Sequence, residues 1–324
     1  MHSIAALQTI IGEALTERNF PDNPNTLYEP IKYFLAIGGK RLRPVLTLLA
    51  AELFGATIKE GLPAALAIEM FHNFTLMHDD IMDEAPLRRG RETIHKKWDI
   101  NTAILSGDAT LIRAYQLLAE CKPELLAELL KVFNKMAQEV CEGQQLDMDF
   151  EKLATVTEEE YLHMIRLKTS VLLGAALEIG AILGGADKQD RSNLYTFGVN
   201  IGIAFQLQDD ILDVYGDPSK FGKQVGGDII ENKKTYLLIN ALQLAKGSDK
   251  QELIHWTEIN EFDQQQKIDR VTAIYNDLGI EKLAHKKKMS FAEQAYQALE
   301  AMAVAREKKL SLIEFTETLL IREH

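Results

Sequence analysis

Two short aspartate-rich segments constrain this chain more than any other feature of its sequence. Residues 79–83 read Asp-Asp-Ile-Met-Asp and residues 209–213 read Asp-Asp-Ile-Leu-Asp, about 130 residues apart in helix-forming surroundings. On a helix, the first and last aspartates of each segment project from the same face, one turn apart. Carboxylates this close repel one another and are rarely buried without partners. The doubled pattern therefore predicts two clusters that bind divalent cations.

The position of the two clusters favours a metal over a solvated surface. Each cluster follows an apolar stretch, residues 71–76 or 201–207, and should lie at the carboxyl end of a core helix. Since that end of a helix is partly negative, carboxylates there are unfavourable unless a cation offsets them. The alternative is two solvated helix ends in a chain with 48 Asp and Glu residues, but bulky aliphatics at matching inner positions argue against coincidence. Hard oxygen ligands without thiolates indicate Mg²⁺.

The rest of the chain predicts an all-α fold. Its 324 residues, of which 46% are hydrophobic and only 8 are proline, suffice for one large helical core. Segments that alternate with period two, which would indicate hairpins, are scarce. Thr157 followed by Glu160 indicates a helical capping box. We expect a single domain over residues 1–324, with helices at residues 4–18, 28–37, 43–54, 61–83, 100–121, 123–150, 157–183, 187–214, 235–244, 264–278, 280–301 and 311–324.

Composition and charge exclude several classes of protein. The formal net charge of −12 argues against a nucleic-acid surface, which needs a basic stripe. Cys121 and Cys141 are too few for a disulfide framework. The amino terminus lacks the basic region and apolar run of a secretory signal, and the most apolar segment, residues 171–186, is short and contains Glu178. We therefore expect a cytoplasmic protein with no transmembrane segment.

Basic side chains in three segments indicate ligands that carry diphosphate groups. Arginine suits bidentate phosphate binding and lysine supplies a compact charge. Taken singly, each basic segment is consistent with a solvated loop. Together with two magnesium-type clusters they predict two diphosphates, one bridged by metals and one held directly by Lys40, Arg43 and Arg89. The basic side chains are Lys40, Arg43, Arg88, Arg89, Lys220, Lys223, Lys233 and Lys234.

These motifs, in this order, resemble the trans-isoprenyl diphosphate synthases of the polyprenyl synthetase family, most closely the geranylgeranyl and farnesyl diphosphate synthases. The matching segments span residues 38–235. They are Gly-Lys-Arg-Leu-Arg-Pro at 39–44, His72, His-Asp-Asp-Ile-Met-Asp at 78–83, Arg-Arg-Gly at 88–90, Gly-Gln-Gln-Leu-Asp at 143–147, Lys-Thr at 168–169, Phe-Gln-Leu-Gln-Asp-Asp-Ile-Leu-Asp at 205–213, Gly-Lys at 222–223, Gly-Asp at 227–228 and Lys233. The resemblance implies a single large helical bundle of the isoprenoid synthase type with a central cavity, and a homodimer.

The resemblance also implies a reaction. Proteins of this family join isopentenyl diphosphate head to tail to an allylic diphosphate, by magnesium-assisted ionisation, condensation and proton elimination. About three Mg²⁺ ions and the allylic diphosphate would be held by carboxylates of the two clusters. The implied metal ligands are Asp79, Asp80, Asp83, Asp209, Asp210 and Asp213.

The remaining implied roles fall to cationic and polar side chains. Arg88, Lys168, Lys223 and Lys233 would neutralise the departing diphosphate, and Thr169 and Gln206 would line the reacting centre. The homoallylic diphosphate would bind to Lys40, Arg43, His72 and Arg89. The catalytic set implied in this way is Asp79, Asp80, Lys168, Thr169, Gln206 and Asp209. Without the resemblance, His72 would be read as a core histidine and Thr169 and Gln206 as ordinary helix residues.

Residues one turn or more before Asp79 should form the floor of the pocket for the growing chain. Phe71 and Phe74 are bulky and Thr75 is small. In the family, an aromatic five positions before a short first motif resembles the geranylgeranyl diphosphate synthases, which predicts a twenty-carbon product. The alternatives are a fifteen-carbon product or, given the longer spacing between Lys223 and Asp228, a longer chain. The plainer reading is that both phenylalanines belong to the core.

Other functions fit the motifs less well. In a terpene cyclase, a different metal motif would replace the second cluster, and no homoallylic site would be needed. A metal-dependent hydrolase would need several histidines at suitable spacing, and the 8 present do not form such a set. A non-catalytic synthase subunit would lose aspartate motifs that this chain keeps.

Overall fold

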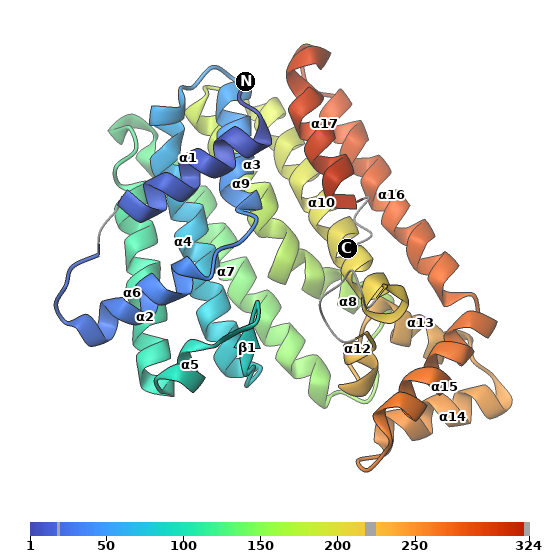
Figure 1. Ribbon diagram of the computed structural model, residues 1–324. Coiled ribbons are helices and arrows are strands. Elements are labelled where there is room, and N and C mark those ends of the chain that lie inside the picture. Colours follow the sequence, from blue (N-terminus) through green and yellow to red (C-terminus); the bar gives the residue numbers. More distant parts are fainter. Residues whose placement is uncertain (18–19, 218–224, 321–324) are drawn as a thin grey trace. The chain divides into compact units, whose positions relative to one another are not determined.

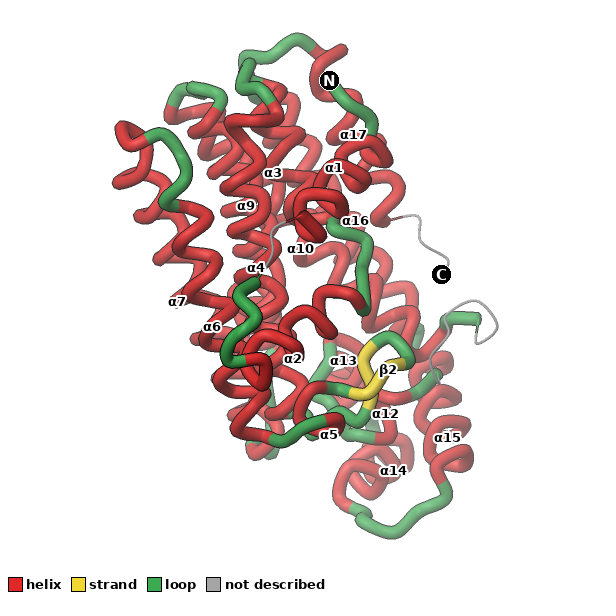
Figure 2. The backbone as a smooth tube through the Cα atoms, turned by 60° about the vertical axis from the view of Figure 1, so that its left-hand side comes forward, coloured by secondary structure: helices red, strands yellow, loops and turns green. Residues whose placement is uncertain are grey.

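Helices make up nearly all of the regular structure in this computed structural model, which describes residues 1–17, 20–217 and 225–320 (Figure 1). In Figure 2 the only strands among the described residues are the two of one short hairpin. The elements are α1 (Ile4–Glu17), α2 (Asn25–Ala36), α3 (Leu42–Leu53), α4 (Ile58–Met82), β1 (Leu87–Arg88), β2 (Arg91–Glu92), α5 (Ile94–Lys97), α6 (Ile100–Leu118), α7 (Pro123–Lys152), α8 (Glu158–Ile165), the π-helical turn η1 (Arg166–Ser170), α9 (Val171–Leu183), α10 (Lys188–Tyr215), α12 (Gly227–Ile230), α13 (Tyr236–Leu244), α14 (Gly247–Glu258), α15 (Gln264–Asp277), α16 (Ile280–Glu300) and α17 (Arg306–Leu320).

The prediction of an all-α fold is confirmed, and most predicted helices agree with the structure within a few residues. Several local features differ. The helix expected over residues 157–183 is interrupted by η1, and the segment expected as a loop over residues 84–92 contains the β1–β2 hairpin. Helix α14 and the short helices α5 and α12 were not expected. The capping box of Thr157 and Glu160 is present at the start of α8.

The chain divides into two compact units. The first comprises residues 1–134, 175–192 and 304–312, and the second comprises residues 135–174, 193–303 and 313–324. The single domain over residues 1–324 and the central cavity, both expected from the sequence, stay predictions. No described helix is both long enough and apolar enough to cross a bilayer.

Helix α4 is the central element of the first unit. It begins with a complete capping box, in which the Thr57 side chain accepts from the Glu60 backbone and the Glu60 side chain accepts from Thr57. Its buried residues lie on several sides of the helix, from Ala64 and Leu66 to Phe71 and Met77, because α3 and α6 both pack against it. The result is a rigid 25-residue rod, about 37 Å long, that ends in the first aspartate cluster.

The hairpin that follows α4 owes its turn to Arg89 and Gly90. Both have positive φ, 52° and 76°, as a two-residue type I′ turn requires. Arg88 and Arg91 are therefore cross-strand partners. The turn therefore sets the directions of the Arg88 and Arg89 side chains, which follow the first aspartate cluster.

The second unit is built around α10. Leu207 and Ile211 are buried in an apolar cluster that also includes Leu237, Leu253 and Ile280, from α13, α14 and α16. Close helix packing beside η1 depends on two glycines. A Cβ at Gly143 would overlap the backbone of Lys168, and one at Gly202 would lie 2.6 Å from Ser170 Cα.

The contact between α9 and α3 in the first unit gives a test of this packing. A Cβ at Gly180 would overlap the Thr47 carbonyl oxygen and would lie 2.8 Å from Ala50 Cβ, and helix backbone cannot move aside cheaply. We expect Gly180→Ala to lower the free energy of unfolding by about 1–3 kcal/mol. Urea unfolding midpoints measure this effect.

Gly12→Ala in α1 is the matched control, because nothing lies within 4 Å of an added Cβ there. Alanine favours helix over glycine by about 1 kcal/mol, so this variant should be neutral or slightly more stable. Equal midpoints for the two variants would contradict the packing described for Gly180.

Candidate functional site

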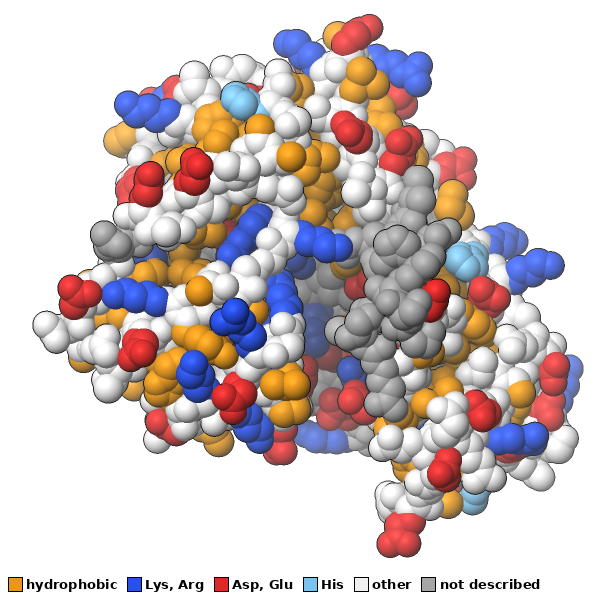
Figure 3. Space-filling model, in the orientation of Figure 1, with side chains coloured by type: hydrophobic (Ala, Val, Ile, Leu, Met, Phe, Trp, Pro, Cys, Tyr) orange, Lys and Arg blue, Asp and Glu red, His pale blue; other side chains and the backbone are white. Residues whose placement is uncertain are grey.

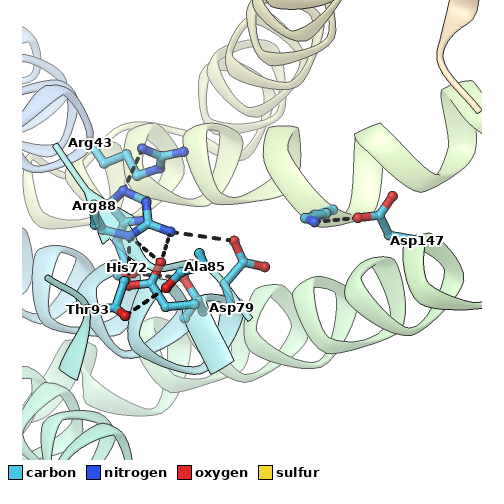
Figure 4. Close-up of polar contacts among 10 residues, drawn as sticks. Arg43, His72, Asp79, Ala85, Arg88, Thr93 and Asp147 are labelled. Carbon is cyan, nitrogen blue, oxygen red and sulfur yellow. Dashed lines mark hydrogen bonds and ion pairs between the residues drawn. The ribbon is translucent and has the colours of Figure 1, made fainter. Parts of the chain in front are cut away.

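The first aspartate cluster lies at the carboxyl end of α4, as the sequence predicted, with Asp83 as the residue that ends the helix. Asp80 is only 2% exposed, and the Arg88 guanidinium covers it. Arg88 Nε donates to both carboxylate oxygens of Asp80, at 2.8 and 2.9 Å, and its Nη2 lies 2.7 Å from Oδ1. The same Nη2 lies 3.9 Å from Asp79 Oδ2 (Figure 4). One arginine thus bridges the first two aspartates.

Burial and charge act in opposite directions on Asp80. Burial raises the pKa of its carboxyl group, and the hydrogen bond and positive charge of Arg88 partly counter that rise. The neighbouring Asp79 raises it further. A cation added beside Asp80 would stabilise its charged form, as expected for a metal-binding residue.

A cluster of positively charged side chains lies around His72, which stands earlier on α4. Arg43 Nη1 lies 3.0 Å from His72 Nε2 (Figure 4). Because arginine can only donate, His72 Nε2 must be the acceptor, and the ring is neutral. Burial, followed by the charges of Arg43, Arg89 and Arg88, lowers the pKa of His72 well below its usual value. Because the resemblance assigns Lys40, Arg43, His72 and Arg89 to the homoallylic diphosphate, we use the name homoallylic pocket for these four side chains, as a prediction of their role.

Gly39 allows Arg89 to join the homoallylic pocket. The Gly39 backbone has φ +156°, and a Cβ there would lie 2.5 Å from Arg89 Nη1. Burial and the nearby charges of Arg41 and Arg88 lower the pKa of Arg89. Figure 3 shows Lys and Arg side chains gathered over α2, the start of α3 and the hairpin. So many cations in one place favour a polyvalent anion such as a diphosphate.

The second aspartate cluster occupies the last two turns of α10, in the second unit. Asp210 is 3% exposed and accepts a short hydrogen bond from the Tyr161 hydroxyl and a 3.3 Å bond from Gln206 Nε2. Burial raises the pKa of Asp210 to about 6, against the effect of these two donors. Asp213 Oδ2 accepts from the backbone N–H of Asp228 at 2.9 Å.

The turn η1 carries Lys168 and Thr169 in the second unit. Lys168 Nζ lies 2.5 Å from Asp147 Oδ2, and Thr169 Oγ1 donates to Gln206 Oε1 at 3.3 Å (Figure 4 for the lysine pair). The π-helical turn sets these two side chains where an unbroken α-helix would not, as such turns often do at functional sites. The Gln206 amide therefore links Thr169 to Asp210.

Two further lysines were expected in the second unit. Lys233 Nζ lies 3.1 Å from Glu231 Oε2 and 3.7 Å from Asp228 Oδ1. Burial, with the charge of Asp213, raises the pKa of Asp228 to about 7. Lys223 lies outside the described residues.

The donor set fits magnesium in chemistry. Among residues 1–17, 20–217 and 225–320, no three His, Cys, Asp or Glu side chains form a metal-binding group by themselves. Mg²⁺ characteristically takes one or two carboxylates and completes its shell with water and substrate phosphates. Asp79 and Asp80 on α4 offer such a pair, and so do Asp209 and Asp213 on α10.

The residues expected to set product length lie on α4. Phe71 is buried, and its ring centroid lies 5.4 Å from that of Phe133 and 5.7 Å from that of Phe74. Phe74 is half-buried and also packs against His78 at 4.8 Å. The hydroxyl of Thr75 donates to the His72 carbonyl at 2.8 Å.

Sequence reasoning missed two residues that support the site. Tyr161 holds Asp210 across 49 residues of chain, and no local pattern connects them. Lys267 is 1% exposed and donates to the Ile230 carbonyl and to Asn232 Oδ1, at 3.2 and 2.6 Å. It thereby holds the turn that precedes Lys233. A lysine in an otherwise polar stretch gave no signal of burial.

The chain is similar to known proteins in sequence and in structure. The family model "Polyprenyl synthetase" matches residues 24–276. The chain is 36% identical over 321 residues, 97% of each chain, to "Geranylgeranyl pyrophosphate synthase" of Geoglobus acetivorans. It is 41% identical over 258 residues to "Geranylfarnesyl diphosphate synthase" of Natronomonas pharaonis, covering 74% of this chain and 75% of that one.

Among solved structures, the "Crystal structure of geranylgeranyl pyrophosphate synthase" matches with a TM-score of 0.95 and 46% identity, over 100% of both chains. The resemblance read from the motifs is therefore confirmed, as is the all-helical fold of the isoprenoid synthase type. This chain belongs to the polyprenyl synthetase family and is a trans-isoprenyl diphosphate synthase, a prenyltransferase.

Proposed function

We propose that this enzyme condenses isopentenyl diphosphate with allylic diphosphates, in the presence of Mg²⁺, to give geranylgeranyl diphosphate. The observation that carries the proposal lies within the first unit. Helix α4 presents His72 of the homoallylic pocket seven residues before Asp79, which is about 10 Å along one rigid helix. At that separation, the aspartate cluster suits a diphosphate that is bound through metal ions, and the basic side chains around His72 suit a second diphosphate that is bound directly.

The proposed roles follow from the charge of each group. When bound, Mg²⁺ would supply positive charge to the allylic diphosphate as its carbon–oxygen bond breaks. In the first unit the proposed metal ligands are Asp79 and Asp80 on α4, with Asp83 nearby. In the second unit they are Asp209 and Asp213 on α10, supported by Asp210. Asp210, buried and fixed by Tyr161, is suited to an orienting role more than to direct contact.

Cationic side chains would complete the stabilisation of the leaving group. Arg88 already bridges Asp79 and Asp80, so a diphosphate joined to those aspartates would lie within its reach. In the second unit, Lys168 and Lys233, together with Lys223, are the cations proposed for the same role. Preorganised charge of this kind is commonly the largest single contribution to catalysis.

The carbon skeleton needs a polar but non-nucleophilic environment once the cation forms. Thr169 and Gln206 are hydrogen-bonded to each other, so their dipoles are oriented in advance. Lys40, Arg43, His72 and Arg89 would hold isopentenyl diphosphate so that its double bond can attack the cation. Water must be excluded meanwhile, because it would capture the cation.

A twenty-carbon product is supported by the relative named "Geranylgeranyl pyrophosphate synthase" and by the half-buried ring of Phe74 on α4. The "Geranylfarnesyl diphosphate synthase" relative keeps a longer product as the second candidate.

A homodimer fits the exposed apolar side chains that share one face of α6, among them Ile104, Leu105 and Ile112. Light scattering would test it. The cytoplasmic location also stays a prediction.

The reaction itself can be tested by incubation of the purified chain with Mg²⁺, labelled isopentenyl diphosphate and five-, ten- or fifteen-carbon allylic primers. We expect a twenty-carbon diphosphate as the main product, and no product when a chelator removes the metal. Release of prenyl alcohol or a cyclic hydrocarbon without chain growth would disprove the proposal.

Arg88→Ala should lower kcat/KM for the allylic substrate by about 100-fold or more, because it removes a preorganised charge at the leaving group. Arg91→Ala is the matched control, since Arg91 is the exposed cross-strand partner of Arg88. Steady-state kinetics measure both variants. Equal activity in the two would exclude Arg88 from the site.

Phe74→Ala should shift the product distribution toward chains longer than twenty carbons, because it removes an aromatic ring near the first cluster. Phe20→Ala, which removes a ring that packs against Tyr28 elsewhere in the first unit, should leave product length unchanged. Chromatography of dephosphorylated products measures chain length. An unchanged distribution in Phe74→Ala would remove this residue from length control.

A further inference from the structure

Arg41 holds the segment between α2 and α3 from inside. It precedes α3 and has a left-handed backbone, with φ 50°. Its Nη2 donates to the Leu35 carbonyl at 2.9 Å, and its Nη1 makes a short ion pair with Glu69 Oε1. Both side chains are largely buried, at 11% and 4% exposed. One guanidinium therefore joins the end of α2 to the middle of α4.

The Glu69 carboxylate is itself held in place. The Asn73 amide, one turn later on α4 and also buried, donates to Glu69 Oε1 at 3.0 Å and to the Glu69 carbonyl at 2.7 Å. His72 of the homoallylic pocket directly precedes Asn73 in the sequence. Glu69 is thus a fixed point on the same rigid helix that carries that pocket.

A second contact holds the same segment from α1. Gln8 Nε2 donates to the Lys40 carbonyl at 2.7 Å. Lys40 and Arg43, which flank Arg41, are the two members of the homoallylic pocket contributed by this segment. Their backbone is therefore held on both sides, by Arg41 with Glu69 and by Gln8.

Glu69 is negatively charged, whereas binding of an anion favours positive charge nearby. It lies close to Arg41 and Arg89, and it raises the pKa of Arg89 against other effects. By charge alone, a carboxylate here weakens attraction for a diphosphate. A buried ion pair also contributes little net stability compared with apolar side chains of similar size. Geometry is the remaining physical reason for it.

We infer that Glu69 is a positioning residue for the homoallylic diphosphate: through Arg41 it fixes the backbone that presents Lys40 and Arg43. This inference rests on the proposed function of that pocket. It predicts that loss of the pair impairs isopentenyl diphosphate binding and leaves the allylic substrate unaffected.

The double variant Arg41→Met/Glu69→Leu tests the inference, because it removes the pair without a change in net charge and without an unpaired buried charge. We expect KM for isopentenyl diphosphate to rise about tenfold, with KM for the allylic substrate and the melting temperature nearly unchanged. Calorimetric titration of isopentenyl diphosphate alone, which cannot react, should show the same loss.

Arg191→Met/Glu128→Leu is the matched control. Arg191 has the same kind of contacts in the first unit, with Nη1 2.5 Å from Glu128 Oε1 and Nε 2.7 Å from the Ala186 carbonyl. Its removal should leave both KM values unchanged. Equal effects on both substrates in the Arg41/Glu69 variant, or effects on kcat alone, would overturn the inference.

Two single variants keep the test decisive if the double variant unfolds. Glu69→Ala makes the pocket more positive, so charge alone predicts tighter isopentenyl diphosphate binding, whereas positioning predicts weaker binding. Gln8→Ala removes only the hydrogen bond to the Lys40 carbonyl and should raise KM for isopentenyl diphosphate about twofold to threefold. Tighter binding in Glu69→Ala together with an unchanged KM in Gln8→Ala would refute the inference. A wild-type enzyme with no condensation would instead refute the proposed function.

Discussion

Repulsion between like charges held close together is the constraint on which the rest of this structure depends. The first unit brings Arg41, Arg43, Arg88 and Arg89 near one half-buried histidine, His72, and it ends α4 with neighbouring aspartates. Part of this repulsion is relieved internally, because Arg88 joins Asp80 and Arg41 joins Glu69. The remainder favours ligands of opposite sign, which are phosphates for the arginines and metal ions for the aspartates.

The length and stiffness of α4 turn that electrostatic arrangement into a linear order of functions. Glu69 pairs with Arg41, His72 contacts Arg43, Phe74 stands where the product chain is proposed to end, and Asp79 and Asp80 are the proposed metal ligands. Because each residue advances the helix by about 1.5 Å, the spacing of these groups is set before any tertiary contact forms. Packing against α3 and α6 then buries the helix on several sides.

Local features were predictable where the physical cause is local. The capping box at Thr157 depends on residues three apart, and it is present. The position of both aspartate clusters at helix ends is confirmed for the same reason. The hairpin after α4 was missed because its strands are two residues each and because its turn places an arginine, Arg89, at positive φ. Helix α14 was missed because it buries only Leu253 and Trp256 and so shows little apolar periodicity.

The sequence by itself determined the chemistry: which side chains are hard oxygen ligands, which are cations, and how far apart they lie along a helix. It also determined the family, since the order of the motifs is specific. Only the tertiary structure decided which carboxylates are buried and what holds them, as with Arg88 on Asp80, Tyr161 on Asp210 and Arg41 on Glu69. The reason is that burial and pairing depend on neighbours brought in from distant parts of the chain, whereas helix spacing depends only on adjacent residues.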